Sequence, residues 1–295
     1  MRFLKKTLAK KNRIFQAILL KGKYPIEVHQ IQNFPSIFLG RDVKMEIFLP
    51  PQYFSSHEAV YPTIIFNDGQ DMEALSMLST LEDLYEKKKI KRSIIIGIHA
   101  GDRMQEYGTI GIPDYKNRGS KADDYQKFIL QEILPYLRQR YKISTHPSKM
   151  AIAGFSLGGL SAFDLAWNNP TIFGKVGVFS GSFWWRSQEF TEDDPDANRI
   201  VHDYLANLPA PKHGATRNPN QKFWLQAGTE DEKDDRNNNG IIDAIDDTLD
   251  LIKALEKLGY HRGQDIKYVE VIGGQHNPNT WGKIMHDFLQ WAVGC

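Results

Sequence analysis

Short apolar runs alternate with amphipathic segments along most of this chain. Residues 63–66 and 93–98 are continuous apolar runs rich in β-branched side chains, which is typical of strands buried on both faces of a parallel sheet. Residues 72–89 and 123–141 instead repeat apolar side chains at helical spacing. The same patterns predict strands at 43–49, 150–153, 175–179, 223–227 and 266–272, and helices at 160–167, 248–258 and 278–293. This alternation predicts an α/β fold, a mostly parallel central sheet with helices on both faces.

The beginning of the chain differs from the rest. Residues 1–23 carry eight basic side chains and no acidic one, with apolar residues near helical spacing. This pattern fits a membrane-surface helix or a basic helix docked on its own domain, and we favour the docked helix. No linker or repeat divides the remainder. We therefore predict a basic, helical extension over residues 1–35 and one domain over residues 36–295.

Composition narrows the classes of function. The chain has 295 residues, 41% of them apolar, and its 37 basic residues nearly balance 36 acidic ones, so no global charge favours nucleic acid. The one cysteine, Cys295, excludes an intrachain disulfide and a cysteine-based metal cluster. No apolar run reaches the ~20 residues that a transmembrane helix needs, and the basic start lacks the apolar stretch of a secretory signal. We expect a cytoplasmic protein of undetermined oligomeric state that acts on small molecules.

The most informative motif is the stretch from Gly154 to Gly159, which reads GFSLGG. It lies between an apolar strand and a helix, the setting in which a G-x-S-x-G turn exposes a nucleophilic serine above a sheet. Asp231 and His276 each follow a later predicted strand, so the chain order Ser156, Asp231, His276 is that of α/β-hydrolases.

These three residue types match the chemistry of a catalytic triad. His276 would take the proton of Ser156 and later protonate the leaving group, while Asp231 would hold the imidazole and stabilise its charged form. Because acidic residues crowd around Asp231, Glu230 is the alternative acid. His276 could also be a surface histidine at the start of the final helix.

An oxyanion hole needs two backbone N–H donors. Leu157, directly after the nucleophile, supplies one. The second should come from the loop after the strand at 63–66, where Gly69 permits a tight turn that aims the N–H of Gln70 at the pocket. An ordinary Asp-Gly turn is the alternative interpretation.

Several landmarks make the chain resemble the putative esterase family of α/β-hydrolases, which includes enterochelin esterases, feruloyl esterases and esterase D-like enzymes. The resemblance extends from about Ser36 to the C-terminus, and its landmarks are residues 39–41, 48–50, 67–70, 154–159, 228–231, 273–276 and Trp281. It implies hydrolysis of a carboxylic ester through an acyl-enzyme without a catalytic cofactor. It also favours Gln70 as an oxyanion donor and implies a polar pocket role for Arg103 and Glu106.

Two loops are predicted to form the walls of the substrate pocket, residues 101–121 and 180–221. Both follow predicted strands and should emerge at the carboxyl edge of the sheet, where ligands bind in open parallel sheets. Within the second loop, Trp184 and Trp185 could stack on an aromatic acyl group or a sugar. They could equally pack beneath the loop.

Residues 235–246 match the spacing of an EF-hand-like calcium loop. Oxygen-bearing side chains fall at positions 1, 3, 5, 9 and 12 around a glycine at position 6, and these residues are Asp235, Asn237, Asn239, Asp243 and Asp246. Position 12 is Asp rather than Glu, and no helix is predicted before the loop. A polar Asn-Gly turn that leads into a helix is the alternative to a structural calcium site.

The residues predict a serine esterase, and the resemblance implies an ester of the enterochelin, feruloyl or acyl-sugar type. An acyltransferase would use the same acyl-enzyme, and a non-catalytic binding protein could share the fold.

Overall fold

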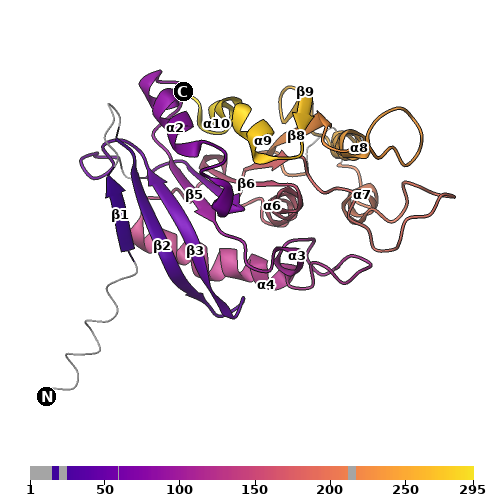
Figure 1. Cartoon of the computed structure of the whole chain (residues 1–295), viewed down its shortest axis with the longest axis horizontal. Helices are drawn as coiled ribbons and strands as arrows, with labels where there is room; N and C mark the ends of the chain where they lie inside the picture. The colour runs from indigo at the N-terminus through magenta and orange to yellow at the C-terminus, as the bar shows by residue number, and fades with distance from the viewer. Residues whose placement is uncertain (1–14, 20–24, 59, 212–216) are drawn as a thin grey trace, which may run out of the picture.

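Nine strands of the described residues form one sheet in the order β1-β2-β3-β5-β4-β6-β7-β8-β9 (Figure 1). This computed structural model describes residues 15–19, 25–58, 60–211 and 217–295. The strand bounds are β1 Phe15–Leu19, β2 Glu27–Ser36, β3 Arg41–Leu49, β4 Thr63–Asn67, β5 Ile94–Ile98, β6 Met150–Phe155, β7 Lys175–Phe179, β8 Lys222–Glu230 and β9 Ile266–Gln275.

Six consecutive strands of the sheet run parallel to one another, as the apolar runs predict. These strands are β5, β4, β6, β7, β8 and β9. Every residue of β4, β5 and β6 is buried, because helices cover both faces of the sheet there. The fold class predicted from the sequence is confirmed.

The prediction of a helical N-terminal extension is wrong for the residues that the structure describes. β1 and β2 are strands, and β2 pairs antiparallel with β3 from Glu27 opposite Leu49 to Ser36 opposite Arg41. The polar outer face of β2 obscured its alternation in the sequence. Residues 1–14 and 20–24, which include most of the basic side chains, lie outside the described residues.

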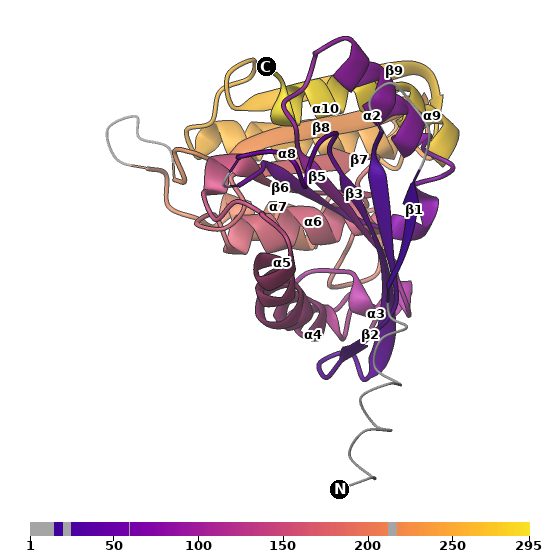
Figure 2. The ribbon, with the colours of Figure 1, turned by 90° about the vertical axis from the view of Figure 1, so that its left-hand side faces the viewer.

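The helices form a layer on each face of the sheet (Figure 2). One apolar cluster joins the sheet to α2, α9 and α10, and the other joins it to α4–α8. The helix bounds are α2 Met77–Glu86, α3 Arg103–Glu106, α4 Ala122–Lys127, α5 Leu134–Arg140, α6 Leu157–Asn168, α7 Ile200–Ala206, α8 Asp243–Lys257, α9 Pro278–Lys283 and α10 Met285–Val293.

Helix boundaries follow local backbone chemistry. The predicted helix at 123–141 is present as α4 and α5 joined by a π-helical segment, Phe128–Ile133. The helix predicted from residue 72 begins only at Met77, because Ser76 has a left-handed φ of 55°. At α9, Asn277 caps the helix by accepting a hydrogen bond from the Thr280 N–H, and proline occupies the first turn.

Within the described residues, none of the helices has the length and apolar character required to cross a bilayer. The carboxyl ends of the parallel strands meet at one edge of the sheet, so the loops after β4, β5, β6, β7, β8 and β9 lie around a common region. All of the predicted active-site residues belong to these loops.

Candidate active site

Ser156 lies on a strained turn between β6 and α6. Its φ of 54° and ψ of −122° are uncommon for a residue with a side chain, and its N–H donates to the Phe179 carbonyl at 2.8 Å. A Cβ on Gly154 would lie 2.2 Å from the Gly158 carbonyl oxygen, and one on Gly158 would lie 2.4 Å from Asp68 Oδ2. Close packing therefore requires both glycines, and the predicted strand–turn–helix context of Ser156 is present.

Ser182, which sequence analysis did not single out, is a polar neighbour of Ser156. The two hydroxyl oxygens are 3.3 Å apart, and the Ser182 N–H donates to the Ser156 carbonyl at 3.1 Å. Ser182 follows β7, the strand next to β6, and it is buried while Ser156 is half-buried. The end of β7 thus supports the turn that presents Ser156.

Asp231 and His276 follow two neighbouring strands. Glu230 in β8 is in register with Gln275 in β9, so Asp231 and His276 are each the first residue beyond this pair. Asp231 Oδ2 accepts a hydrogen bond from the Gly228 N–H at 2.9 Å, while its buried Oδ1 has no hydrogen-bond partner among the described residues. Strand register therefore brings the acid and the histidine together.

The pKa of His276 is lowered from its ordinary value. Desolvation by neighbouring atoms is the main cause, the positive charge of Arg103 acts in the same direction, and the negative charge of Asp231 opposes both. A lowered pKa keeps the imidazole neutral near pH 7, which is the form that can accept a proton from a serine.

Trp281 connects the histidine to the strand that carries Ser156. Its ring meets His276 edge-on, with centroids 5.4 Å apart, and stacks on Phe155 at 5.0 Å. Its indole Nε1 donates to Ser180 Oγ at 2.9 Å. The landmark tryptophan of the motif therefore holds the ends of β6, β7 and β9 together.

No hydrogen bond joins Ser156 to His276, or His276 to Asp231, in the described part of the chain. Catalytic hydrogen bonds are often long in proteins without substrate and shorten in the complex. The three residues follow β6, β8 and β9 at the same edge of the sheet, and their assignment as a triad stays a prediction.

The loop that contains Gln70 is tied to the serine turn. Asn67 Nδ2 donates to the Gly158 carbonyl at 2.8 Å, and Asp68 then takes a left-handed φ of 59°. The backbone N–H groups of Gln70 and Leu157 donate no hydrogen bond to any described residue. Because β4 and β6 are parallel neighbours, these two free donors follow adjacent strand ends, as the oxyanion-hole prediction requires.

Arg103 has a role that the sequence did not indicate. Its guanidinium donates to both oxygens of Asp68, at 2.9 and 3.0 Å, and to the Phe155 carbonyl at 3.0 Å. It therefore joins the Gln70 loop to the residue that precedes Ser156. The Tyr107 hydroxyl reinforces this loop by accepting the Asp68 N–H at 3.0 Å. Substrate contact by Arg103, which is partly exposed, stays a prediction.

The predicted substrate contact of Glu106 is wrong. The side chain is buried, and its two oxygens accept hydrogen bonds from Arg41 Nε and Nη2, both at 2.6 Å. Arg41 lies in β3, distant in sequence, so this pairing could not be seen from local residues. Glu106 instead anchors the loop after β5 to the antiparallel edge of the sheet.

The side chains of Trp184 and Trp185 lie in different environments. Trp185 is completely buried beneath Arg118 and packs within the core, so its predicted role as a pocket residue is wrong. Trp184 is 36% exposed and lines a cavity of about 510 Å³. The other lining residues are Tyr115, Arg186, Phe190, Glu232, Asp234, Asp235, Arg236 and Asp243.

Glu232 in this cavity was also missed by the sequence analysis. Burial raises the pKa of Glu232 to about 7, and its buried Oε1 has no hydrogen-bond partner among the described residues. A protonated carboxyl can donate a hydrogen bond to an oxygen of a bound ligand. Its position directly after Asp231 was the only available signal.

Comparisons with known proteins identify the family and the fold of the chain. A family model described as "Putative esterase" matches residues 36–291. The YjcH protein of Bacillus subtilis (strain 168) is 30% identical over 262 residues, which cover 88% of this chain and 95% of YjcH.

Two solved structures share the fold. The enterobactin esterase FES from Shigella flexneri has a TM-score of 0.67 at 19% identity, and the match covers 93% of this chain but only 60% of that protein. A ferulic acid esterase has a TM-score of 0.65 at 16% identity, with 95% and 99% of the respective chains covered.

Proposed function

The chain belongs to the Putative esterase family and is a hydrolase that acts on esters, and from that premise we propose that it is a serine esterase that uses Ser156, His276 and Asp231. The observation that best supports this proposal is the register of β8 and β9, in which Glu230 lies opposite Gln275, so that Asp231 and His276 both follow this pair at the sheet edge where Ser156 also lies. The influence of the Asp231 charge on the pKa of His276 supports the same assignment.

The proposed reaction proceeds in two halves. The Ser156 hydroxyl attacks the acyl carbon while His276 takes its proton, and the C–O bond to the leaving alcohol breaks as His276 returns that proton to the alcohol oxygen. Water then attacks the acyl carbon while His276 takes a proton from it, and the bond from the acyl carbon to Ser156 Oγ breaks as His276 returns that proton to Oγ, which releases the acid and restores Ser156. Asp231 stabilises the imidazolium in both halves.

Two backbone donors serve the oxyanion in this proposal. The free N–H groups of Leu157 and Gln70 would donate to the carbonyl oxygen as it gains negative charge. Their strand ends are held together by Asn67 and Arg103, so little reorganisation is needed when the charge develops. The contribution of each donor to turnover is typically ~10²–10³-fold.

We propose an ester with an aromatic or sugar portion as the natural substrate class. The similarity to an enterobactin esterase and a ferulic acid esterase supports the aromatic choice. The cavity beside Trp184 offers three aromatic side chains together with Glu232 and two arginines, which suits a planar group that bears hydroxyls.

Hydrolysis of p-nitrophenyl acetate by the wild type and by Ser156→Ala tests the mechanism. We expect Ser156→Ala to lose nearly all of the enzymatic rate, because it removes the nucleophile. Ser182→Ala is the matched control, since it removes a neighbouring hydroxyl and should retain most of the activity. Equal rates for the wild type and Ser156→Ala would refute the proposal.

The same assay distinguishes the alternatives. Ester products formed after addition of an alcohol acceptor, at the expense of free acid, would indicate acyl transfer from the same acyl-enzyme. An absence of turnover on phenolic, sugar and p-nitrophenyl esters would indicate a binding protein.

A further inference from the structure

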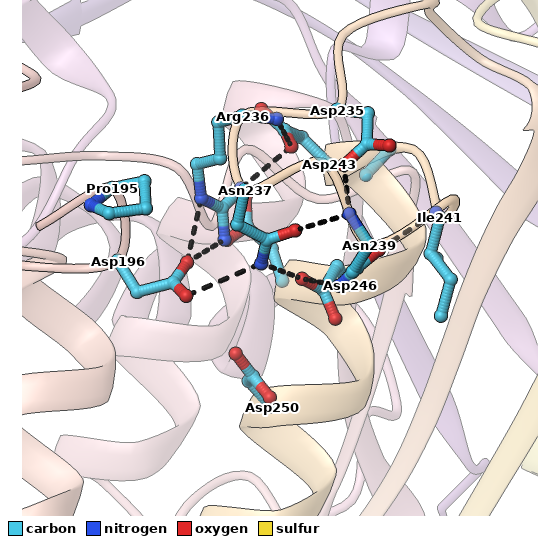
Figure 3. A network of polar contacts seen from close by, with 12 residues as sticks. Pro195, Asp196, Asp235, Arg236, Asn237, Asn239, Ile241, Asp243, Asp246 and Asp250 are labelled. Atoms are coloured by element: carbon cyan, nitrogen blue, oxygen red, sulfur yellow. Dashed lines mark hydrogen bonds and ion pairs between the residues drawn. The ribbon is translucent and has the colours of Figure 1, made fainter. Parts of the chain in front are cut away.

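The polar loop that follows Asp231 takes no part in the proposed proton transfers, yet its side chains form a network of hydrogen bonds and ion pairs (Figure 3). Asp235 accepts hydrogen bonds from the backbone N–H groups of Asn239 at 3.0 Å and Gly240 at 2.9 Å. Asn237 and Asn239 point from this loop toward the first turn of α8. The loop thus surrounds a small region beside Asp246.

Asp246 is a buried carboxylate that has no direct ion pair among the described residues. It is 7% exposed, and its recorded donors are two neutral amides, Asn237 Nδ2 at 2.9 Å and Asn239 Nδ2 at 3.0 Å. It forms no ion pair with any described residue. Buried charges in proteins are normally paired or coordinated to metals, because burial of an isolated charge is costly.

The next residue shows that this region does supply cations to other carboxylates. Asp247 is 1% exposed, and its Oδ1 receives Arg199 at 2.6 Å and Arg236 at 2.7 Å. Both arginines pair with Asp247 and with other acidic side chains, and neither of them pairs with Asp246. Asp246 therefore lacks the direct ion pairs that the adjacent buried acid has, and the nearby charge of Lys253 acts on it without such a contact.

The loop after β7 brings the carboxylate of Asp196 close to Asp246. Oxygen atoms of Asp196, Asp246 and Asp250 lie within 4.8 Å of one another. Asp250 is neutralised by Arg199 and Lys253, at 2.8 and 2.9 Å. Asp196 is paired through Oδ1 with Arg236 at 2.8 Å, while its Oδ2 faces Asn237 Nδ2 at 3.4 Å and shares that amide with Asp246.

We propose that this cluster binds one calcium ion. The ligands are the carboxylates of Asp246, Asp235 and Asp196 and the side-chain amide oxygens of Asn237 and Asn239, all hard oxygen donors of the kind that calcium prefers. The two amides now present nitrogen to Asp246. Their oxygens accept the backbone N–H groups of Asn239 at 3.2 Å and Ile241 at 2.8 Å. A half-turn of each amide would exchange these two hydrogen bonds for two oxygen ligands, and a divalent cation would supply the positive charge that no direct ion pair gives Asp246.

The structure changes the ligand set that the sequence spacing predicts. Asp243 Oδ1 accepts a hydrogen bond from the backbone N–H of Arg236 at 2.9 Å and lies 3.2 Å from the guanidinium of that residue. Asp243 is therefore directed toward Arg236 and away from Asp246. Asp196, from the loop after β7, takes its place. The ion would therefore join the loops that carry Trp184 and Asp231, and both of these loops line the cavity.

Thermal unfolding of the full chain tests this proposal, with the protein stripped by EGTA and then titrated with calcium. At a free calcium concentration about 100 times Kd, we expect the wild-type Tm to rise by about 5 °C or more. Equilibrium dialysis should find one calcium ion per chain. Magnesium should give a smaller shift, since it demands a smaller, more regular octahedral site.

Asp246→Asn is the decisive variant. It should abolish the calcium-induced rise, while its Tm in EGTA should equal or exceed that of the wild type because it removes an unpaired buried charge. A purely structural role of Asp246 would instead lower Tm in EGTA as well. Asp234→Asn makes the same charge change on an exposed residue of the same loop and should respond to calcium like the wild type.

Three outcomes would overturn the proposal: a wild-type Tm that is identical in EGTA and calcium, an Asp246→Asn variant that responds like the wild type, or no calcium retained in dialysis. An equal response to magnesium would overturn the choice of calcium.

Discussion

The serine side and the acid side of the candidate active site are fixed by different forces. Around Ser156, glycines allow backbone segments to approach within contact distance, and a single guanidinium, that of Arg103, closes the arrangement. Beyond Asp231, the chain is instead held by side-chain charges, with Arg199 and Arg236 reaching Asp247 from separate loops. Steric constraints operate on one side and electrostatic constraints on the other.

This difference teaches how each side should respond to change. Close packing is insensitive to salt and pH but does not tolerate an added methyl group. A network of buried charges tolerates small changes in shape but fails when one partner is removed. Substitutions on the two sides should therefore differ in whether they affect turnover, pH dependence or stability.

The largest expected effect tests the acid side. Asp231→Asn should lower kcat by about 10⁴-fold, because the imidazole loses the charge and the acceptor that stabilise its working form. Glu230→Gln, one residue earlier, is the matched control and should change kcat only slightly. A larger loss for Glu230→Gln than for Asp231→Asn would show that the adjacent glutamate is the acid, and steady-state kinetics decide between them.

On the serine side, Gly158→Ala should lower kcat by roughly 10²–10³-fold. The added Cβ would lie 2.4 Å from Asp68 Oδ2 and would push the Gln70 loop away from the serine turn. Far-UV circular dichroism should show that α6 remains. Turnover equal to that of the wild type would mean that the loop does not supply an oxyanion donor.

Arg41→Met examines a charge pair that supports the site without belonging to it. It leaves the buried carboxylate of Glu106 without its partner, and we expect a loss of about 2 kcal/mol in the free energy of unfolding. Denaturant titration measures this loss. Arg41→Met combined with Glu106→Gln should recover part of it, whereas an additive further loss would contradict the pairing argument.

The smallest expected effect is about a tenfold loss of kcat/KM in Arg103→Gln, with a change in pH dependence. The Arg103 charge lowers the pKa of His276, so its removal should raise that pKa. Activity requires neutral His276 and is lost as pH falls through its pKa, so the acidic limb should move to higher pH.

Arg103→Lys separates the charge from the geometry. The lysine keeps the positive charge but cannot make the forked contact with Asp68, so the acidic limb should return toward its wild-type position while the rate stays low. A pH profile unchanged in Arg103→Gln would show that this charge does not act on His276.

Sequence patterns predicted the parallel core because each strand there is buried on both faces and its side chains are nearly all apolar. The same criterion missed β2, whose burial depends on pairing with β3 and whose outward positions are polar. It also treated Trp184 and Trp185 alike, although the alternate directions of two neighbouring side chains send one to the cavity and the other to the core.

The sequence alone determined the α/β-hydrolase fold, the strand–turn–helix setting of Ser156 and the strand ends at which Asp231 and His276 occur, because these features follow from local spacing and backbone chemistry. Only the tertiary structure decided which charges meet. Arg41 neutralises Glu106, Arg103 joins Asp68 to the serine turn, and Asp246 has no direct ion pair among the described residues, since each outcome depends on residues brought together from distant parts of the chain.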